Sequence, residues 1–544
     1  MNRNTESRFA LNPTRLDMER SVFDRSASVK TSFNTGDIIP FYVDEVLPGD
    51  TFNIRTSRVV RLQTLITPMM DNLYLDTYYF FVPNRLVWEH WKEFNGENSS
   101  SPWIPTVDYS VPQITAPDGG WKVGTIADYF GLPINVDNIS VSALPFRAYA
   151  LIMNEWFRDE NLTQPLNIPT TDSNSVGSNG SDFVTDVVLG GKPFKASKYH
   201  DYFTSALPSP QKGPDVTLGL LGDIPVRPMT SVDLASNEVS LHFKKLNGEE
   251  FNGLQNVVTN AGDTMAFGTT SGQGAGAIFP SNLGASLSGI SVASVNQLRL
   301  AFQVQRLYEK DARGGTRYIE VLKSHFGVTS PDARLQRPEY LGGNRVPINV
   351  NQVVQQSSTD STSPQGNVAG YSVTTDTHND FTRSFTEHGF IIGLCVARYD
   401  HSYQQGIERF WSRKDRFDYY WPVLANIGEQ PILNKEIYAS GTDTDNEVFG
   451  YQEAWADYRY RPNRITGEMR STAELSLDVW HLGDDYVDLP RLSDGWIRED
   501  ASNVDRVLAV NSSVANQLFA DFYIENKTTR PMPVYSIPGL IDHH

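Results

Sequence analysis

The chain has 544 residues, of which 39% are hydrophobic and 20% charged, which is enough apolar material for a sizeable core. Its net charge of −18 argues against a free nucleic-acid-binding protein, because such proteins usually carry a basic domain. Cys395 is the only cysteine, so a disulfide-stapled secreted fold is excluded.

Residues 1–36 are predicted to form an arm with few large apolar residues. Six cations face four acidic residues, a local excess of +2 that is opposite in sign to the whole chain. Two interpretations stay open: a solvated tail, or an internal arm that lies along neighbouring chains or DNA. In the second case the phosphate contacts would come from Arg3, Arg8, Arg15, Arg20, Arg25 and Lys30.

Neither a signal peptide nor a membrane span is expected. The first 30 residues have no apolar stretch of the required kind. The longest apolar run, Phe390–Ala397, is too short to cross a bilayer. We therefore expect no membrane insertion and no export by the usual route.

Six stretches have the β-branched and aromatic composition of strands. In chain order they are Phe41–Leu47, Thr51–Ile66, Asn72–Val82, Gly389–Tyr399, Leu475–Leu482 and Leu518–Glu525. Long intervals between strands are typical of a jelly roll with elaborated loops, so we predict a mainly β fold.

Helical patterns are few. Asn84 is expected to cap a short helix, and apolar residues at 3.6-residue spacing predict another over Pro145–Glu160. A third helix begins after Ser294 and breaks at a glycine pair, and a fourth covers Tyr318–Phe326 with Gly327 as its C-cap.

Three polar intervals interrupt these patterns. Thr170–Asp182 and Gln355–Asp380 are rich in Ser, Thr, Asn and Gly and predict loops. Met229–Leu298 differs, since it has nine glycines, seven charges, and no Arg, Tyr or Trp in 70 residues. Such a segment buries little apolar surface alone, yet a structureless loop of this length is improbable in a compact domain.

Motifs that could carry catalysis are weak. Gly272–Ala277 fits the loose dinucleotide pattern G-x-G-x-x-A, but no strand leads into it and no helix follows. His388 and Cys395 lie seven residues apart in a strand-like run, so they would point to opposite faces. A nucleophile and its base must share a face, so a buried cysteine and a satisfied histidine are the better interpretation.

Two acidic groups have residue types that could form sites. Asp443, Asp445 and Glu447 alternate like a calcium loop but lack its glycine and final glutamate, so a surface turn is favoured. Asp484-Asp485 could suit a glycosidase, although the separation of two carboxylates cannot be taken from sequence. We predict no cofactor, no metal and no enzymatic activity. A carbohydrate-active β-protein and a cellular β-sandwich binding module remain as alternatives, and both would elute as small oligomers.

Short runs spread over most of the chain carry a resemblance to a known family. They are Phe80–Trp88, Asn154–Glu160, His200–Gly213, Asp311–Tyr318, Ser330–Arg334, Glu387–Gly389, Phe449–Glu453 and Arg530–Leu540. Each is modest alone, but their number and order resemble the major capsid protein of gokushovirus-type Microviridae, which are small icosahedral single-stranded DNA phages.

The resemblance implies an eight-stranded antiparallel jelly-roll barrel with long loop insertions and a few short helices. It implies 60 copies in a T=1 shell around circular single-stranded DNA, with contacts at fivefold, threefold and twofold axes. It also implies an internal scaffolding protein, a DNA pilot protein, and a small basic DNA-packaging protein that fits the charge of −18. Assembly would occur in the host cytoplasm, and a threefold protrusion would touch a bacterial surface receptor.

The resemblance also suggests how the chain is divided. Residues 1–36 would be an internal arm, 37–228 and 299–526 the two parts of the barrel, 229–298 the protrusion, and 527–544 an extended C-terminal arm. Copies meeting at a threefold axis could bury Leu241, Phe243, Phe251, Phe267, Ile278 and Phe279. Candidate contacts between subunits are His200, Asp201, Tyr202, Phe203, Arg313, Gly314, Gly315, Arg317, Arg530, Pro531 and Pro533.

Overall fold

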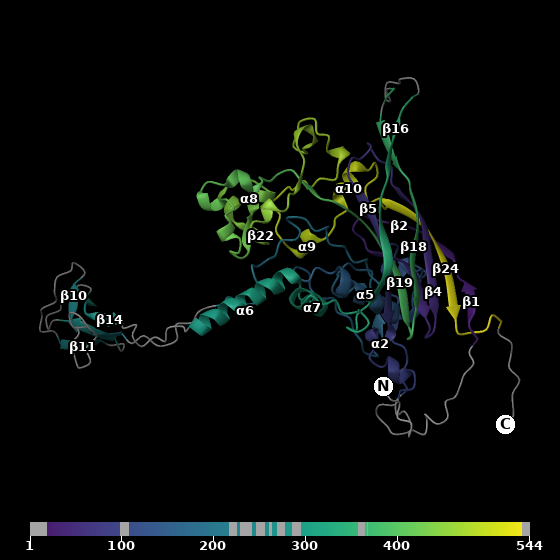
Figure 1. Cartoon of the computed structure of the whole chain (residues 1–544), viewed down its shortest axis with the longest axis horizontal. Helices are drawn as coiled ribbons and strands as arrows, with labels where there is room; N and C mark the ends of the chain where they lie inside the picture. Colours follow the sequence, from purple (N-terminus) through teal and green to yellow (C-terminus); the bar gives the residue numbers. More distant parts are fainter. Residues whose placement is uncertain are drawn as a thin grey trace. The chain divides into compact units, whose positions relative to one another are not determined.

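The computed structural model describes residues 19–97, 108–216, 226–228, 242–245, 256–260, 264–268, 278–285, 295–356, 365–366 and 368–535. The chain divides into two compact units, Met1–Lys212 with Glu309–His544, and Gly213–Tyr308. The first unit is mainly β, as expected, and contains two large antiparallel sheets (Figure 1).

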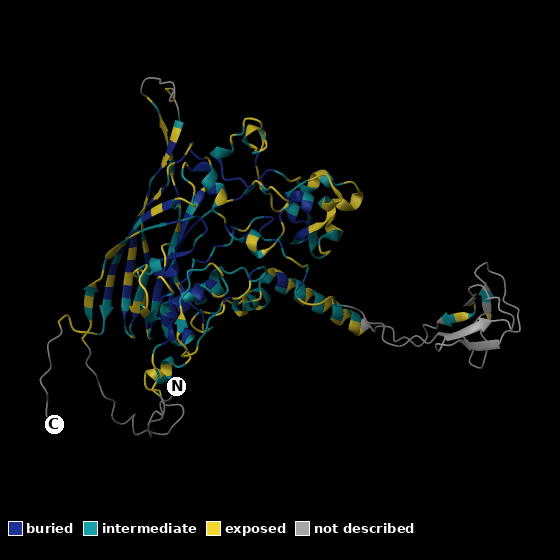
Figure 2. Cartoon of the chain, turned by 180° about the vertical axis from the view of Figure 1, so that it is seen from behind, coloured by how far each residue is buried: buried dark blue, intermediate teal, exposed yellow. Residues whose placement is uncertain are grey.

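One of the two sheets has a solvent-facing side. In this solvent-facing sheet, β24 (Leu518–Arg530) pairs with β4 (Thr51–Leu62), and β4 pairs with β18 (Thr374–Ser384). Along the other edge of β24, β1 (Ser21–Asp24) and β2 (Ala27–Phe33) follow each other. Buried and exposed residues alternate along β4 and β24, visible as stripes in Figure 2, because one face meets the core and the other meets solvent.

The other sheet is covered on both faces. This central sheet has the order β15 (Glu339–Pro347), β5 (Leu73–Pro83), β19 (Gly389–Tyr399), β3 (Ile39–Val46). Along β19, odd-numbered residues such as Cys395 face the core between the sheets, and even-numbered ones face a second core. Double burial explains why this strand is apolar almost throughout, and its predicted bounds are confirmed.

Aromatic packing fills the two cores. Between the sheets, the rings of Phe41 and Phe522 stack with centroids 4.4 Å apart. On the far side of the central sheet, Trp88, Trp121 and Phe146 are fully buried. Each large apolar side chain removed from water contributes about 1.5–3 kcal/mol to folding.

Short helices cover the second core. They are α2 (Asn84–Val87), α3 (Trp91–Phe94), α4 (Ile126–Tyr129) and α5 (Leu144–Ile152), which continues as a π-helical turn over Met153–Phe157. The helix predicted over Pro145–Glu160 is confirmed in position. The predicted role of Asn84 is wrong, because Pro83 is the N-cap residue and Asn84 lies inside the helix.

Two further helices follow in the chain. α6 covers Val295–Gly314 and α7 covers Tyr318–Phe326. Gly327 ends α7 with a φ of +69°, which confirms the predicted C-cap. The predicted cap Ser294 lies outside the described residues.

Smaller elements complete the first unit. β6 (Gln113–Thr115) pairs with β7 (Ser140–Ser142) and β8 (Ser175–Val176). The other pairs are β16 (Val350–Val354) with β17 (Val368–Ser372), β20 (Ser402–Tyr403) with β23 (Asn463–Arg464), and β21 (Gln430–Leu433) with β22 (Val448–Gln452). The remaining helices are α8 (Asn434–Ile437), α9 (Asp494–Ile497) and α10 (Ser502–Val507).

Three predicted boundaries need correction. Residues 21–33 are not part of an arm, because β1 and β2 complete the edge of the solvent-facing sheet. Within Leu475–Leu482 the chain makes a 3-10 turn, Asp478–Trp480, instead of a strand. The polar interval Gln355–Asp380 contains β17 and most of β18, since polar residues suit strands that face solvent.

The second unit carries its own strand pairs. β9 (Val226–Pro228) pairs with β14 (Leu283–Ala285), β10 (Phe243–Lys245) with β13 (Ile278–Pro280), and β11 (Asn256–Asn260) with β12 (Thr264–Gly268). The low-charge interval 229–298 lies inside this unit, and its described residues include β10 to β14.

Candidate functional site

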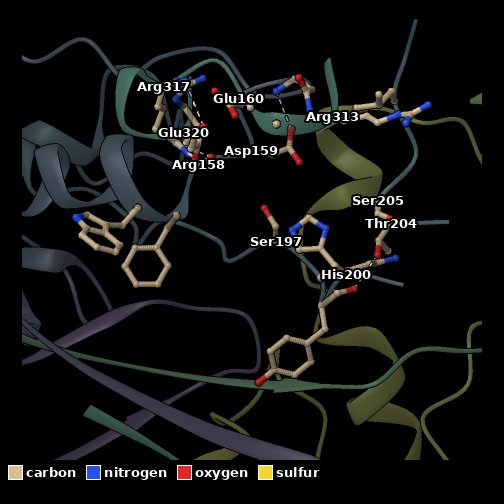
Figure 3. A pocket seen from close by; sticks show the side chains of 18 of the residues that line it. Arg158, Asp159, Glu160, Ser197, His200, Thr204, Ser205, Arg313, Arg317 and Glu320 are labelled. Carbon is tan, nitrogen blue, oxygen red and sulfur yellow. Dashed lines mark hydrogen bonds and ion pairs between the residues drawn. The ribbon is translucent and has the colours of Figure 1, made fainter. Parts of the chain in front are cut away.

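Four of the sequence runs that lie far apart in the chain meet at one cleft of the first unit. The cleft has a volume of about 730 Å³ and is lined by residues of β5, β15 and β19, the π-helical turn, residues 197–207 and the α6–α7 junction. Figure 3 labels its polar lining, namely Arg158, Asp159, Glu160, Ser197, His200, Thr204, Ser205, Arg313, Arg317 and Glu320.

Arg317 links the α6–α7 junction to the end of the π-helical turn by hydrogen bonds. Its guanidinium donates to the Arg158 carbonyl oxygen at 2.7 Å and pairs with Glu320 at 3.3 Å. The backbone N–H and the hydroxyl of Thr316 donate to Glu160 at 3.1 and 2.7 Å. These bonds hold the wall of the cleft in one geometry.

The glycine pair at this junction is required by close approach. Gly315 has a φ of +88°, and a Cβ there would lie 2.3 Å from a Glu320 oxygen and 2.7 Å from a Glu160 oxygen. A Cβ on Gly314 would lie 2.5 Å from the Ser324 Cβ. Burial, and then the adjacent Glu160 carboxyl, raise the pKa of Glu320.

Asp76, a buried residue of β5, organises the charged residues beside the central sheet. It accepts from Arg398 at 2.6 Å, from Arg345 at 2.7 Å and from the Tyr199 hydroxyl at 2.8 Å. Each guanidinium also lies 4.3 Å from the centre of the Tyr199 ring. Burial alone would raise the pKa of Asp76, but the two arginines outweigh it and hold that pKa below its usual value.

The run that begins at His200 is used mainly inside the chain. Asp201 accepts from the Tyr403 hydroxyl at 2.6 Å, and Tyr202 and Phe203 are buried in a third apolar cluster. His200 itself is exposed at the cleft. Of these four candidates, only His200 is exposed in the single chain.

The remaining intersubunit candidates are also partly engaged by their own chain. Arg313 pairs with the Glu429 carboxylate. Arg530 pairs with the buried Asp50 at 3.1 Å, at the end of β24. Pro531 is half-buried, and Pro533 is exposed.

The N-terminal cations divide into two groups. Arg3, Arg8 and Arg15 lie outside the described residues, and Arg20 is exposed. Arg25 makes a two-point ion pair with Asp44 at 2.6 and 2.8 Å, and Lys30 pairs with Asp521 at 3.3 Å. The last two charges are thus partly neutralised by carboxylates of β3 and β24.

The six apolar candidates of the second unit are partly described. Leu241 and Phe251 lie outside the described residues. Phe243 lies in β10, Phe267 in β12, and Ile278 with Phe279 in β13.

Sequence reasoning missed a buried polar cluster around His401. One ring nitrogen lies 2.9 Å from Asp484 and the other 3.2 Å from Glu499, while Lys198 lies 3.8 Å from Asp484. Burial alone would lower the pKa of His401, but Glu499 and Asp484 outweigh it and raise that pKa to about 9. Residues 83 positions apart give no sequence signal of such a contact. The cluster also places Asp484 in the interior, paired with cations.

The other sequence-level candidates have structural roles. Asp445 accepts from the backbone N–H groups of Ser440 and Gly441, as in the expected surface turn. Cys395 is fully buried, which raises the pKa of its thiol. Within the described residues, no group of three or more His, Cys, Asp and Glu side chains is placed to hold a metal, and no helix could cross a membrane.

Comparison with known proteins covers nearly the whole chain. The model of the family described as "Capsid protein (F protein)" matches residues 14–540. The chain belongs to this capsid protein family. Capsid protein VP1 of Spiroplasma virus 4 is 48% identical over 94% of the chain and 93% of its own length. Capsid proteins VP1 of Chlamydia phage 1 and Bdellovibrio phage phiMH2K are 42% and 43% identical over at least 98% of both chains.

A capsid protein is a structural component of the virion, not an enzyme. The resemblance drawn from the short sequence runs is confirmed. The enzymatic alternative and the cellular binding module are both excluded by the family. The cleft at the α6–α7 junction, with its fixed polar wall, is therefore best understood as part of a structural protein.

Proposed function

We propose that 60 copies of this chain form a T=1 icosahedral shell around a circular single-stranded DNA genome. The chain's membership of the capsid protein family carries the proposal, because the match runs from residue 14 to residue 540. Closed symmetric shells place the same surfaces of every copy in equivalent contacts, which suits one chain type.

We infer that the two sheets together make an eight-stranded jelly roll. With β1 and β2 counted as one strand, the eight strands in chain order are β2, β3, β4, β5, β15, β18, β19 and β24. The first pairs with the eighth (β2–β24) and the second with the seventh (β3–β19). The third pairs with the sixth (β4–β18) and the fourth with the fifth (β5–β15). A long antiparallel hairpin wound into a barrel has this pairing, and viral capsid domains commonly use it.

Electron microscopy tests the shell. The chain would be expressed in a bacterium with its internal scaffolding protein, and lysates would be sedimented. Sixty copies of a 60.9 kDa chain give closed particles of about 3.7 MDa. Small oligomers at all protein concentrations would contradict the proposal.

The rim of the cleft is proposed as a contact between subunits. His200 is exposed there, next to a wall held by the hydrogen bonds of Arg317 and Thr316. A preformed surface costs little ordering entropy on association. Replacing His200→Glu should reduce particle yield without changing the fold of the soluble chain, and unchanged yield would count against this contact.

The second unit is proposed as a protrusion at the threefold axes that touches a host surface receptor. It is a separate compact unit inserted between residues 212 and 309, and binding functions concentrate on such insertions. Replacing residues 230–289 with a short Gly/Ser linker should leave particles intact but unable to adsorb to host cells. Failed assembly or undiminished adsorption would refute this role.

The extreme N-terminus is proposed to face the DNA, together with a small basic packaging protein. Arg25 and Lys30 already pair with carboxylates, so Arg8 and Arg15 are the better residues to test. Arg8→Ala with Arg15→Ala should lower the DNA content per particle, and the size of this loss should depend on the salt concentration. Equal DNA content would count against an internal arm. Assembly in the host cytoplasm and a DNA pilot protein complete the proposal.

A further inference from the structure

A segment of the first unit that no sequence motif singled out exposes an unusual number of aromatic rings. Between Arg409 and Leu424 the chain makes three 3-10 turns, Arg409–Ser412, Arg416–Asp418 and Pro422–Leu424. Six aromatic side chains here are 41–74% exposed, with Phe417 at 74% and Trp411 at 71%. We call this set the aromatic surface: Phe410, Trp411, Phe417, Tyr419, Tyr420 and Trp421.

The exposed area is large for a solitary chain. At about 200 Å² per ring, the six side chains expose on the order of 600 Å². Summed over the six rings, this area is comparable to the largest apolar patches of typical monomers, and it approaches the roughly 800 Å² that each partner buries in a standard protein interface. Val423, in the last of the three turns, is 94% exposed and adds to the apolar area of the segment.

Internal contacts hold these rings in place. Arg413 lies 4.3 Å from the Tyr458 ring centre and 5.4 Å from that of Tyr419. The Trp421 indole donates to the Arg416 carbonyl oxygen at 3.0 Å, and the Arg416 guanidinium lies 4.8 Å from the Trp421 ring centre. Tyr419 and Trp421 are thus positioned before any partner arrives, which lowers the entropy cost of binding.

A hollow adjoins the surface. A cleft of about 460 Å³ is lined by Phe410, Arg413, Tyr458, Tyr460 and the buried Phe203, among others. A cavity of this size accepts one or two large side chains. Trp, Tyr and Arg around a pocket are the residues that dominate binding energy in protein interfaces.

Two of the segment's three arginines are engaged by carboxylates of the chain itself, which favours a protein partner over nucleic acid. Arg413 is paired with Asp457, and Arg409 donates to the Pro431 carbonyl oxygen at 2.7 Å and lies 3.6 Å from Glu436. Guanidinium groups paired with carboxylates offer little charge to phosphates, whereas single-stranded DNA sites combine stacking rings with a positive groove. Arg416, the third arginine of the segment, lies over the Trp421 ring.

We infer that the aromatic surface binds a second copy of this chain and is one of the contacts that join subunits. The inference rests on the proposed shell only in naming that partner. The copies of a shell protein meet at high local concentration, and a rotational contact places this surface against a different patch of the neighbour. The neighbour would supply apolar side chains for the hollow beside Phe410.

Paired double variants of the full-length chain test the inference. The first is Trp411→Ser with Phe417→Ser, and its matched control is Leu475→Ser with Val487→Ser, which removes side chains that are 81% and 89% exposed elsewhere. Sedimentation velocity over a concentration series measures self-association, and circular dichroism checks the fold. We expect the first variant to weaken self-association at least tenfold, while the control matches the unmodified chain.

The other outcomes are decisive as well. If the first variant associates like the control, or the unmodified chain stays monomeric at every concentration, the inference is overturned. It is also overturned if the first variant loses binding to a labelled oligothymidine strand while its self-association is unchanged. Small oligomers that depend on Trp411 and Phe417, without closed particles, would uphold this contact and refute the shell.

Discussion

Gly315 offers a sharp test of how the wall of the cleft is held. In Gly315→Ala, the new side chain must adopt a φ near +88° and place its Cβ 2.3 Å from a Glu320 oxygen. The left-handed conformation costs about 1 kcal/mol for alanine. Displacing a carboxylate that holds a charge-assisted hydrogen bond adds about 2 kcal/mol. We therefore expect a local loss of about 3 kcal/mol.

Gly327→Ala is the matched control for this change. Gly327 has a φ of +69°, but nothing lies within 4 Å of the position that a Cβ would take, so only the backbone cost of about 1 kcal/mol applies. The difference of about 2 kcal/mol between the variants corresponds to about a 30-fold change in an opening equilibrium.

Amide hydrogen exchange measures that difference directly, because it reports the free energy of local opening. The amides to follow are those of Thr316 and Arg317, which donate to Glu160 at 3.1 Å and to Glu320 at 3.2 Å. They should exchange about 30-fold faster in Gly315→Ala than in Gly327→Ala. Equal protection in the two variants would refute the argument that these carboxylates crowd the glycine.

Four further outcomes follow from the buried groups and the tail. Because the pKa of His401 is raised to about 9, its protonated form stabilises the fold fully below the unfolded pKa near 6.5, and this stabilisation is lost as the pH rises to 9. The melting temperature should therefore fall between pH 6.5 and 9, and it should fall less in Glu499→Gln. Asp76→Asn leaves two arginines unpaired and should cost about 3 kcal/mol in urea unfolding, and a loss under 1 kcal/mol would contradict this. Cys395, fully buried with a raised pKa, should react with a thiol reagent at least 100-fold faster once unfolded. Deleting residues 531–544 should reduce particle yield more than solubility, and normal particles would argue against a docked tail.

Local sequence determined the elements whose conformation depends on neighbouring residues. The bounds of β19 follow from its apolar run, and the end of α7 follows from Gly327, since only glycine adopts a left-handed C-cap without strain. The family could also be inferred from the sequence, because its short runs recur in order along the chain.

Tertiary structure alone decided what depends on distant partners. Residues 21–33 resemble a polar arm until β24, 500 positions away, supplies the hydrogen bonds that make them strands. The charges of His401 and Asp484 acquire a role only when the fold removes them from water together. The aromatic surface also depends on the tertiary structure. Composition predicts that aromatic residues are mostly buried, and only the packed chain shows which of them stay exposed.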